Sequence, residues 1–231
     1  LHVRSRRQRQ MCIRDSSEPL APSASVPSTR RRGLMALGLG VLTTTMLGAL
    51  TGCNLTKPDF KAVDVTGASY AQGFTLTDAQ GLRRSLSDYS GKLVVVFFGF
   101  TQCPDVCPTT LAELAEVKQM LGTDGDKLQG IFISVDPERD TPEILQAYVG
   151  NFDPGFVALR PTPEELAEVA KAYKVYYAKV PGSTPETYTM DHTAGSFVYD
   201  TRNKLRLFTR YGSGAQALAD DLKILLSEQK A

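Results

Sequence analysis

Two cysteines in the stretch Phe97–Leu111, FFGFTQCPDVCPTTL, have the clearest capacity for chemistry in this sequence. Cys103 and Cys107 are separated by three residues and follow directly on an apolar run. Two thiols that converge in a fold can act as a redox pair, bind a metal ion or close a structural disulfide. The spacing alone favours none of these uses, so the neighbouring residues have to discriminate between them.

Pro108, which follows the second cysteine, indicates where a helix begins. Proline is favoured at the first position of a helix and disfavours helical backbone for the residue before it. We therefore expect Cys107 to be the N-cap and Cys103 to lie in the loop before the helix. Unpaired N–H groups at a helix N-terminus favour thiolate over thiol. A disulfide here would close a loop of only five residues and would stabilise the fold little, so activated thiols are the better interpretation.

His192 is the only histidine besides His2, and we expect it in a Pro/Gly/Thr-rich loop before a core strand. In a thioredoxin-like sheet that loop faces the turn that carries the cysteines. Two thiolates and one imidazole form a soft ligand set that suits Cu(I), or Cu(II) with an added ligand, whereas structural zinc normally takes four protein ligands. Asp191 is a candidate to orient the imidazole. An ordinary surface histidine beside an ordinary loop carboxylate is the alternative.

The elements that position these residues follow from the hydrophobic pattern of residues 62–231. Continuous apolar runs predict buried central strands at 93–98 and 128–135. Shorter strands and helices alternate around them, which predicts an α/β fold with right-handed parallel units. We expect a thioredoxin-like fold, a central mixed sheet flanked by helices, with an added β-hairpin that carries the histidine loop. The further strands are expected at 72–76, 82–86, 156–159, 175–180, 195–199 and 204–211, and the helices at 108–121, 141–149, 162–173 and 215–226.

The N-terminal part has the layout of a bacterial export signal. Three arginines at 30–32 precede an apolar stretch that ends in Leu50-Thr51-Gly52-Cys53, which resembles a lipobox. We interpret Cys53 as the lipidated first residue of the mature protein. The alternative is an uncleaved anchor over Leu34–Thr51, near the short end of the ~17–25 residues that a membrane span requires. Both place the domain in the cell envelope, membrane-anchored and facing the periplasm or exterior.

These features predict a simple domain organisation. Residues 1–29 form a tail, 30–52 a signal or anchor, 53–61 a tether and 62–231 a copper-binding domain. Residues 1–16 are interpreted as foreign, because Met11–Ser16 matches a translation of a transposon end used in preparing sequencing libraries. Residues 53–231 hold 18 Lys and Arg against 23 Asp and Glu, so no basic patch indicates nucleic-acid binding. With Cys12 set aside and Cys53 lipidated, the remaining thiols are too few for a disulfide-stapled scaffold.

Three ordered motifs resemble the Sco/SenC family of exported copper proteins. Phe98–Thr109 is similar to the family's FGxTxCPDxCP core, Ser134–Pro142 to its second signature, and Asp191-His192-Thr193 to its third. The resemblance covers about residues 70–226. It implies a thioredoxin fold, copper ligands at Cys103, Cys107 and His192, and delivery of copper to the CuA centre of cytochrome c oxidase subunit II. For some relatives it implies reduction of the disulfide at that target site instead.

The second signature has a plain structural interpretation. We expect Ser134–Pro142 to be a strand end and a turn, with Asp140 or Thr141 capping the next helix. A metal role for Asp136 is disfavoured, because a hard carboxylate suits Cu(I) poorly.

The sequence thus leads to one main hypothesis and two alternatives. The main hypothesis is a copper chaperone whose partners are the oxidase subunit and, further, other copper chaperones or thiol reductants. The enzyme alternative is a thiol–disulfide oxidoreductase that uses Cys103 and Cys107 without metal. A copper buffer in the cell envelope would use the same ligands and have no partner.

Overall fold

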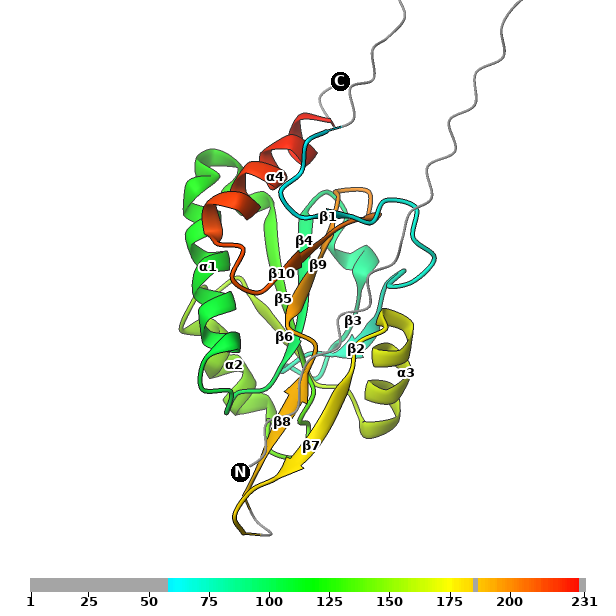
Figure 1. Cartoon of the computed structure of the whole chain (residues 1–231), viewed down its shortest axis with the longest axis vertical. Helices are drawn as coiled ribbons and strands as arrows, with labels where there is room; N and C mark the ends of the chain where they lie inside the picture. The colour runs from blue at the N-terminus through cyan, green and yellow to red at the C-terminus, as the bar shows by residue number, and fades with distance from the viewer. Residues whose placement is uncertain (1–57, 185–186, 229–231) are drawn as a thin grey trace, which may run out of the picture. The chain divides into compact units, whose positions relative to one another are not determined.

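The computed structural model of the chain describes residues 58–184 and 187–228 (Figure 1). They belong to a compact unit that begins at Asn54. The predictions for residues 1–57, including the lipidation of Cys53, lie outside the described residues. Within the described ranges, no helix has the length and apolar character needed to cross a membrane.

Strands and helices alternate along the described chain, as the hydrophobic pattern predicts. Two short 3-10 helices, Leu86–Tyr89 and Gly122–Lys127, also occur. The helices are α1 (Val106–Met120), α2 (Pro142–Gly150), α3 (Pro163–Tyr173) and α4 (Ala215–Ser227). The strands are β1 (Val63–Asp64), β2 (Thr75–Thr77), β3 (Arg83–Ser85), β4 (Leu93–Gly99), β5 (Leu128–Ser134), β6 (Val157–Leu159), β7 (Tyr177–Pro181), β8 (Tyr188–His192), β9 (Gly195–Tyr199) and β10 (Leu205–Arg210).

The main sheet is mixed, with the strand order β1-β10-β9-β4-β5-β6. β4 pairs in parallel with β5 and antiparallel with β9. Phe97 of β4 lies opposite Ser196 of β9, so the chain that leaves β4 and the chain that enters β9 lie next to each other. This register brings the cysteine loop close to the segment that ends at His192.

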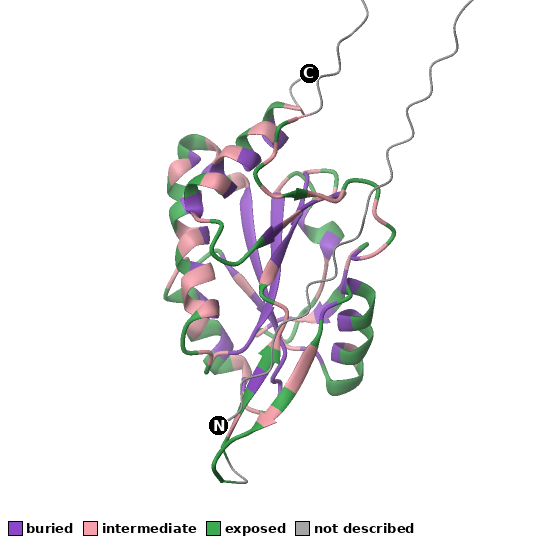
Figure 2. Cartoon of the chain, viewed as in Figure 1, coloured by how far each residue is buried: buried purple, intermediate pink, exposed green. Residues whose placement is uncertain are grey.

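Two apolar layers cover the faces of the sheet. Because side chains alternate along a strand, Leu93, Val95 and Phe97 join one core cluster and Val94, Val96 and Phe98 the other. Helices α1, α2 and α4 pack on the first face and α3 on the second (Figure 1). Every residue of β4 and β5 is buried (Figure 2). The predicted central mixed sheet between helices is thus the observed architecture.

The structure differs from the predicted elements mainly near the histidine. The expected loop between the strands at 175–180 and 195–199 contains an extra strand, β8, which pairs with β7 in a separate two-stranded sheet. Tyr188, Met190 and His192 alternate with polar residues as in a half-buried strand, but the Pro/Gly/Thr-rich surroundings favoured a loop. β2 and β3 also form a sheet of their own. The short strand β1 was not predicted.

Candidate metal centre

The cysteines lie where β4 passes into α1, but the helix begins earlier than predicted. Asp105 is the N-cap, so Cys107 is the second helical residue and not the cap. Pro108 then lies third, where its missing N–H costs nothing because the first four helical N–H groups have no partner within the helix. The restriction that proline places on its predecessor is overcome by packing, since Cys107 is fully buried among apolar side chains. Cys103 is half-buried in the loop, as expected.

Gly99 makes room for Cys107, a role that the sequence analysis did not identify. A Cβ atom at Gly99 would lie 2.6 Å from the Cys107 Sγ atom and 2.8 Å from the Phe132 ring. Both distances are too short for real contacts, so the Cys107 sulfur occupies space that any other residue at position 99 would fill. The signal in the sequence was a glycine placed between Phe98 and Phe100 at the end of a buried strand.

His192 lies at the end of β8 and turns its imidazole toward the cysteines. Its Nε2 atom is 3.7 Å from the Cys107 Sγ atom, and its Nδ1 atom is 3.1 Å from the backbone oxygen of Thr193. That carbonyl therefore occupies the position that we expected for Asp191, which is exposed. The role of Asp191 in orienting the ring stays a prediction, and in this structure its side chain lies on the other side of the strand because neighbouring residues face opposite ways.

The three predicted ligands come together. The Sγ atoms of Cys103 and Cys107 and a ring nitrogen of His192 all lie within 4.8 Å of one another. A metal ion with bonds of ~2.3 Å to sulfur and ~2.0 Å to nitrogen, spread at about 120°, would hold those atoms about 3.7 Å apart. The Cys107–His192 distance agrees with that value. The residues therefore fit a three-coordinate ion such as Cu(I).

The two thiols have opposite electrostatic properties. The pKa of Cys103 is lowered to about 5, first because the Cys107 thiol donates a hydrogen bond to its thiolate. The N–H groups of Asp105 and Cys107 at the start of α1 lower it further, burial opposes them, and His192 contributes least. The same thiol–thiolate bond and burial raise the pKa of Cys107. Near neutral pH Cys103 is therefore a reactive thiolate, whereas Cys107 is a protonated, buried thiol.

A buried carboxyl group holds the start of the cysteine loop. Asp140 is fully buried and accepts hydrogen bonds from the Thr101 hydroxyl and the Ser134 hydroxyl, both at 2.6 Å. Burial raises the pKa of Asp140, whereas these hydroxyl groups oppose the shift. Thr141, the other predicted cap, is the N-cap of α2 and accepts from the Ile144 N–H. The second signature therefore ties the cysteine loop to β5.

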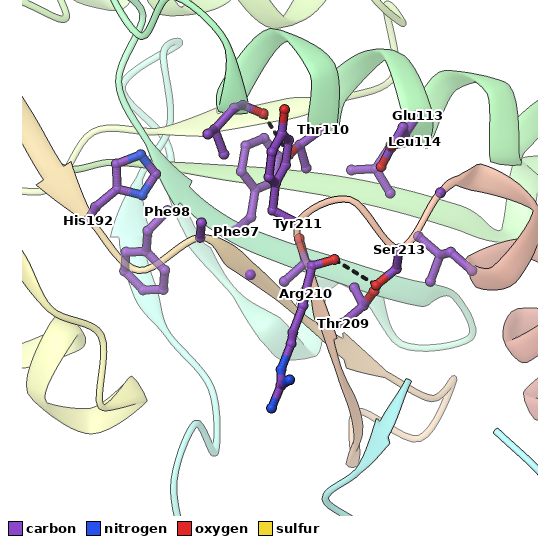
Figure 3. A pocket seen from close by; sticks show the side chains of 16 residues that line it. Phe97, Phe98, Thr110, Glu113, Leu114, His192, Thr209, Arg210, Tyr211 and Ser213 are labelled. Carbon is purple, nitrogen blue, oxygen red and sulfur yellow. Dashed lines mark hydrogen bonds between the residues drawn. The ribbon is translucent and has the colours of Figure 1, made fainter. Parts of the chain in front are cut away.

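A small cavity lies beside His192, between α1 and the strands β9 and β10 (Figure 3). Its volume is about 30 Å³, room for a few water molecules and far below the ~300–1,000 Å³ of sites for small organic molecules. Tyr211 lies along it and donates a hydrogen bond from its hydroxyl to the Asp105 carboxylate, 3.1 Å away. This cavity is therefore too small for an organic substrate.

An α/β domain that joins two cysteines at a strand–helix junction to a histidine on an added hairpin defines a thioredoxin-like metal-binding protein. Residues 63–227 match the SCO1/SenC family, and the chain belongs to this family. The expected thioredoxin-like fold is confirmed.

Individual relatives agree with this assignment. The human mitochondrial SCO1 homolog is 44% identical over 122 residues, which is 52% of this chain and 40% of that protein. The chain thus spans less than half of that relative's length. The copper-bound structure of Bradyrhizobium japonicum ScoI is 42% identical, with a TM-score of 0.60, and the match covers 66% of this chain and 97% of that one. BsSco, described as a member of the Sco family of cytochrome c oxidase assembly proteins, shares the fold at 22% identity and a TM-score of 0.53.

Proposed function

We propose that this protein is a membrane-tethered copper chaperone that delivers copper to the CuA centre of cytochrome c oxidase subunit II. The observation that carries the proposal is the convergence of Cys103, Cys107 and His192 within 4.8 Å. The copper-bound ScoI relative, which is 42% identical, supports the copper-binding part of it. On this proposal residues 30–52 are the export signal or anchor, Cys53 carries the lipid, residues 53–61 connect it to the domain, and the domain faces the periplasm or exterior.

The geometry supports transfer by exchange of ligands. Three ligands leave a coordination position open, so a thiolate of the partner can bind the ion before any ligand of the chaperone leaves. Cys103 is half-buried, whereas Cys107 is fully buried, so a partner reaches the Cys103 side of the centre. Thiol–disulfide exchange with a disulfide of a partner, which takes up two electrons and the Cys107 proton and leaves as a thiol and a thiolate, would join the two sulfurs in a disulfide and remove two of the three ligands.

Copper binding and transfer by the reduced protein test this function. We expect one tightly bound copper ion in the wild-type protein and its loss in Cys103→Ser and His192→Ala. The loaded protein should then pass copper to a metal-free oxidase subunit II domain, as measured by the copper content of each protein after separation. Wild-type copper content and spectrum in either variant would refute the proposed ligand set.

A thiol–disulfide oxidoreductase is the second candidate, and the lowered pKa of Cys103 favours it. An accessible thiolate beside a protected thiol is suited to attack on a disulfide, with the second thiol resolving the mixed disulfide. In that case His192→Ala should leave the rate of disulfide reduction unchanged. Copper transfer that depends on His192, together with slow reduction of the subunit II disulfide, would favour the chaperone.

A further inference from the structure

The turn at Asp136–Arg139 lies between the cysteine loop and the histidine hairpin, the strands β7 and β8. The Arg139 Nη1 atom donates to the Gln102 side-chain oxygen, 3.0 Å away, and to the Tyr188 backbone oxygen, 2.9 Å away. Gln102 precedes Cys103 in the sequence, and Tyr188 begins the strand that ends at His192. One guanidinium group therefore bonds to both parts of the metal centre.

Asp136 holds this arginine in place. Its side chain is 2% exposed, and its carboxylate accepts from the Arg139 Nε atom and from the Tyr188 hydroxyl at 2.8 Å. Hydrogen bonds to a charged partner are stronger and more directional than neutral ones. Asp136 thus fixes the guanidinium and the first residue of β8 relative to each other.

Ring contacts also connect Arg139 to the His192 imidazole. The Arg139 guanidinium carbon lies 3.6 Å from the centre of the Tyr188 ring and 5.9 Å from that of Phe100. Phe100 in turn meets the His192 ring edge to face, with 6.0 Å between centroids.

The buried Arg139 Nη2 atom lacks a hydrogen-bond partner in the described part of the chain. The arginine is therefore kept here at an energetic cost that a surface arginine would not incur.

Met190 is the buried residue of the described hairpin strands and packs in the core cluster, so the rest of the hairpin relies on contacts such as these for its position. β7 and β8 pair only with each other, and no strand of the described main sheet extends into them. The other polar link between the turn and the hairpin, Lys179 to Glu138 at 2.7 Å, is largely exposed. Exposed ion pairs contribute little to stability, so the guanidinium contacts carry more of the positioning.

We propose that Arg139, held by Asp136, positions the β7–β8 hairpin so that His192 meets Cys103 and Cys107. This inference rests on the proposed function for its copper readout, and it makes Arg139 a positioning residue and not a ligand. Removing the guanidinium should leave both thiols in place and loosen the histidine.

The test uses the reduced full chain and the variant Arg139→Gln. Changes to groups that support metal ligands typically weaken metal binding by about 10- to 100-fold, and we expect a loss of this size in a Cu(I) competition titration. The sulfur-to-copper absorption band and the electron paramagnetic resonance of the Cu(II) form should shift away from those of the wild-type protein, because the imidazole is no longer held at the ion. Arg139→Lys, which keeps the charge but has no planar fork, should recover part of the wild-type signal.

Arg160→Gln is the matched control. The Arg160 guanidinium donates to the Pro137 and Asp140 backbone oxygens of the same turn, but neither bond reaches the cysteine loop or the hairpin. We expect wild-type copper affinity and spectra from this variant. A loss as large as that of Arg139→Gln would overturn the proposal, because general loosening of the turn would then explain both results.

A metal-free measurement separates this inference from the copper function. The His192 ring resonances in nuclear magnetic resonance spectra report the Phe100 contact without any metal. We expect them to shift in Arg139→Gln and, less, in Tyr188→Phe, which removes only the hydroxyl bond to Asp136 and serves if the first variant does not fold. Unshifted resonances would overturn the positioning role, whereas shifted resonances in a protein that binds no copper would refute the proposed function alone.

Discussion

Cys103 and Cys107 lie where a fully buried strand of the main sheet meets a helix, whereas His192 ends a hairpin outside that sheet. The first region is held by apolar packing, since Cys107 lies among the core side chains of α1 and β4. The second is exposed or half-buried along most of its length (Figure 2), and apart from the buried Met190 it is held by polar contacts to a turn. The cysteines are therefore fixed by the packing of the main sheet, whereas the position of His192 depends on how the hairpin is held against that sheet.

The largest expected effect is on the pKa of the Cys103 thiol, measured in variants of the metal-free, reduced protein. Because the thiolate is the reactive form, alkylation of Cys103 should slow as the pH falls through about 5, the value to which its pKa is lowered. Mass spectrometry across a pH series measures the midpoint. Cys107→Ala, which removes the donor, should raise it most, and His192→Ala only slightly. An equal rise in both variants would show that Cys107 and His192 affect the pKa of Cys103 equally, which would contradict the comparison.

Removing core volume beneath the cysteines should cost the most stability. Phe132 is buried and packs edge to face on Phe97, 5.1 Å away between centroids. Phe132→Ala should lower the free energy of unfolding by about 3–5 kcal/mol. Tyr176→Ala, beside the hairpin at 62% exposure, should change it by about 0.5 kcal/mol or less. Urea denaturation of both variants checks this, and similar losses would contradict the comparison.

Filling the space at the end of β4 should have a smaller effect. In Gly99→Ala the new Cβ would meet the Cys107 sulfur and the Phe132 ring, and overpacking of this kind costs about 1–3 kcal/mol. Copper binding should weaken as well, because Cys107 has to move. Gly150→Ala is the control, since its Cβ would meet nothing within 4 Å. Unchanged stability and copper affinity in Gly99→Ala would show that the cysteine region is more adaptable than its packing implies.

The smallest effect is expected at the rim of the hairpin. Lys179→Ala removes an ion pair whose side chains are 45% and 67% exposed, and such pairs contribute about 0–1 kcal/mol. Copper affinity should stay within about fivefold of wild type, since about 1 kcal/mol at most is involved. A loss comparable to that of Arg139→Gln would show that the exposed pair also positions His192.

The sequence predicted the cysteine region better than the histidine region, for physical reasons. The run Leu93–Phe98 is apolar without interruption, and only a buried strand accommodates it. Pro108 placed the helix start within two residues of Asp105, and the three ligands followed from their chemical types. β8 gains its stability from pairing with β7 and from the turn at 136–139. The local pattern at 188–192 therefore did not suffice to distinguish this strand from the expected loop.

Contacts between distant segments were the features that the sequence analysis missed. The bonds of Arg139 to Gln102 and to Tyr188 join residues 37 and 49 positions apart. Those of Thr101 to Asp140 span 39. Local periodicity carries no information on such pairs. The motif at Ser134–Pro142 marked the place, but only the fold showed that its charged residues serve positioning and not coordination.

The register of β4 against β9 also determines when the copper site can form during folding. Cys107 and His192 are 85 positions apart, and they meet only after these two strands have paired. Pairing over such a separation forms late and slowly compared with local structure. An unfolded chain offers copper only the neighbouring thiols, so the three-ligand site comes into existence with the finished sheet. Binding of copper by all three ligands therefore requires the folded sheet.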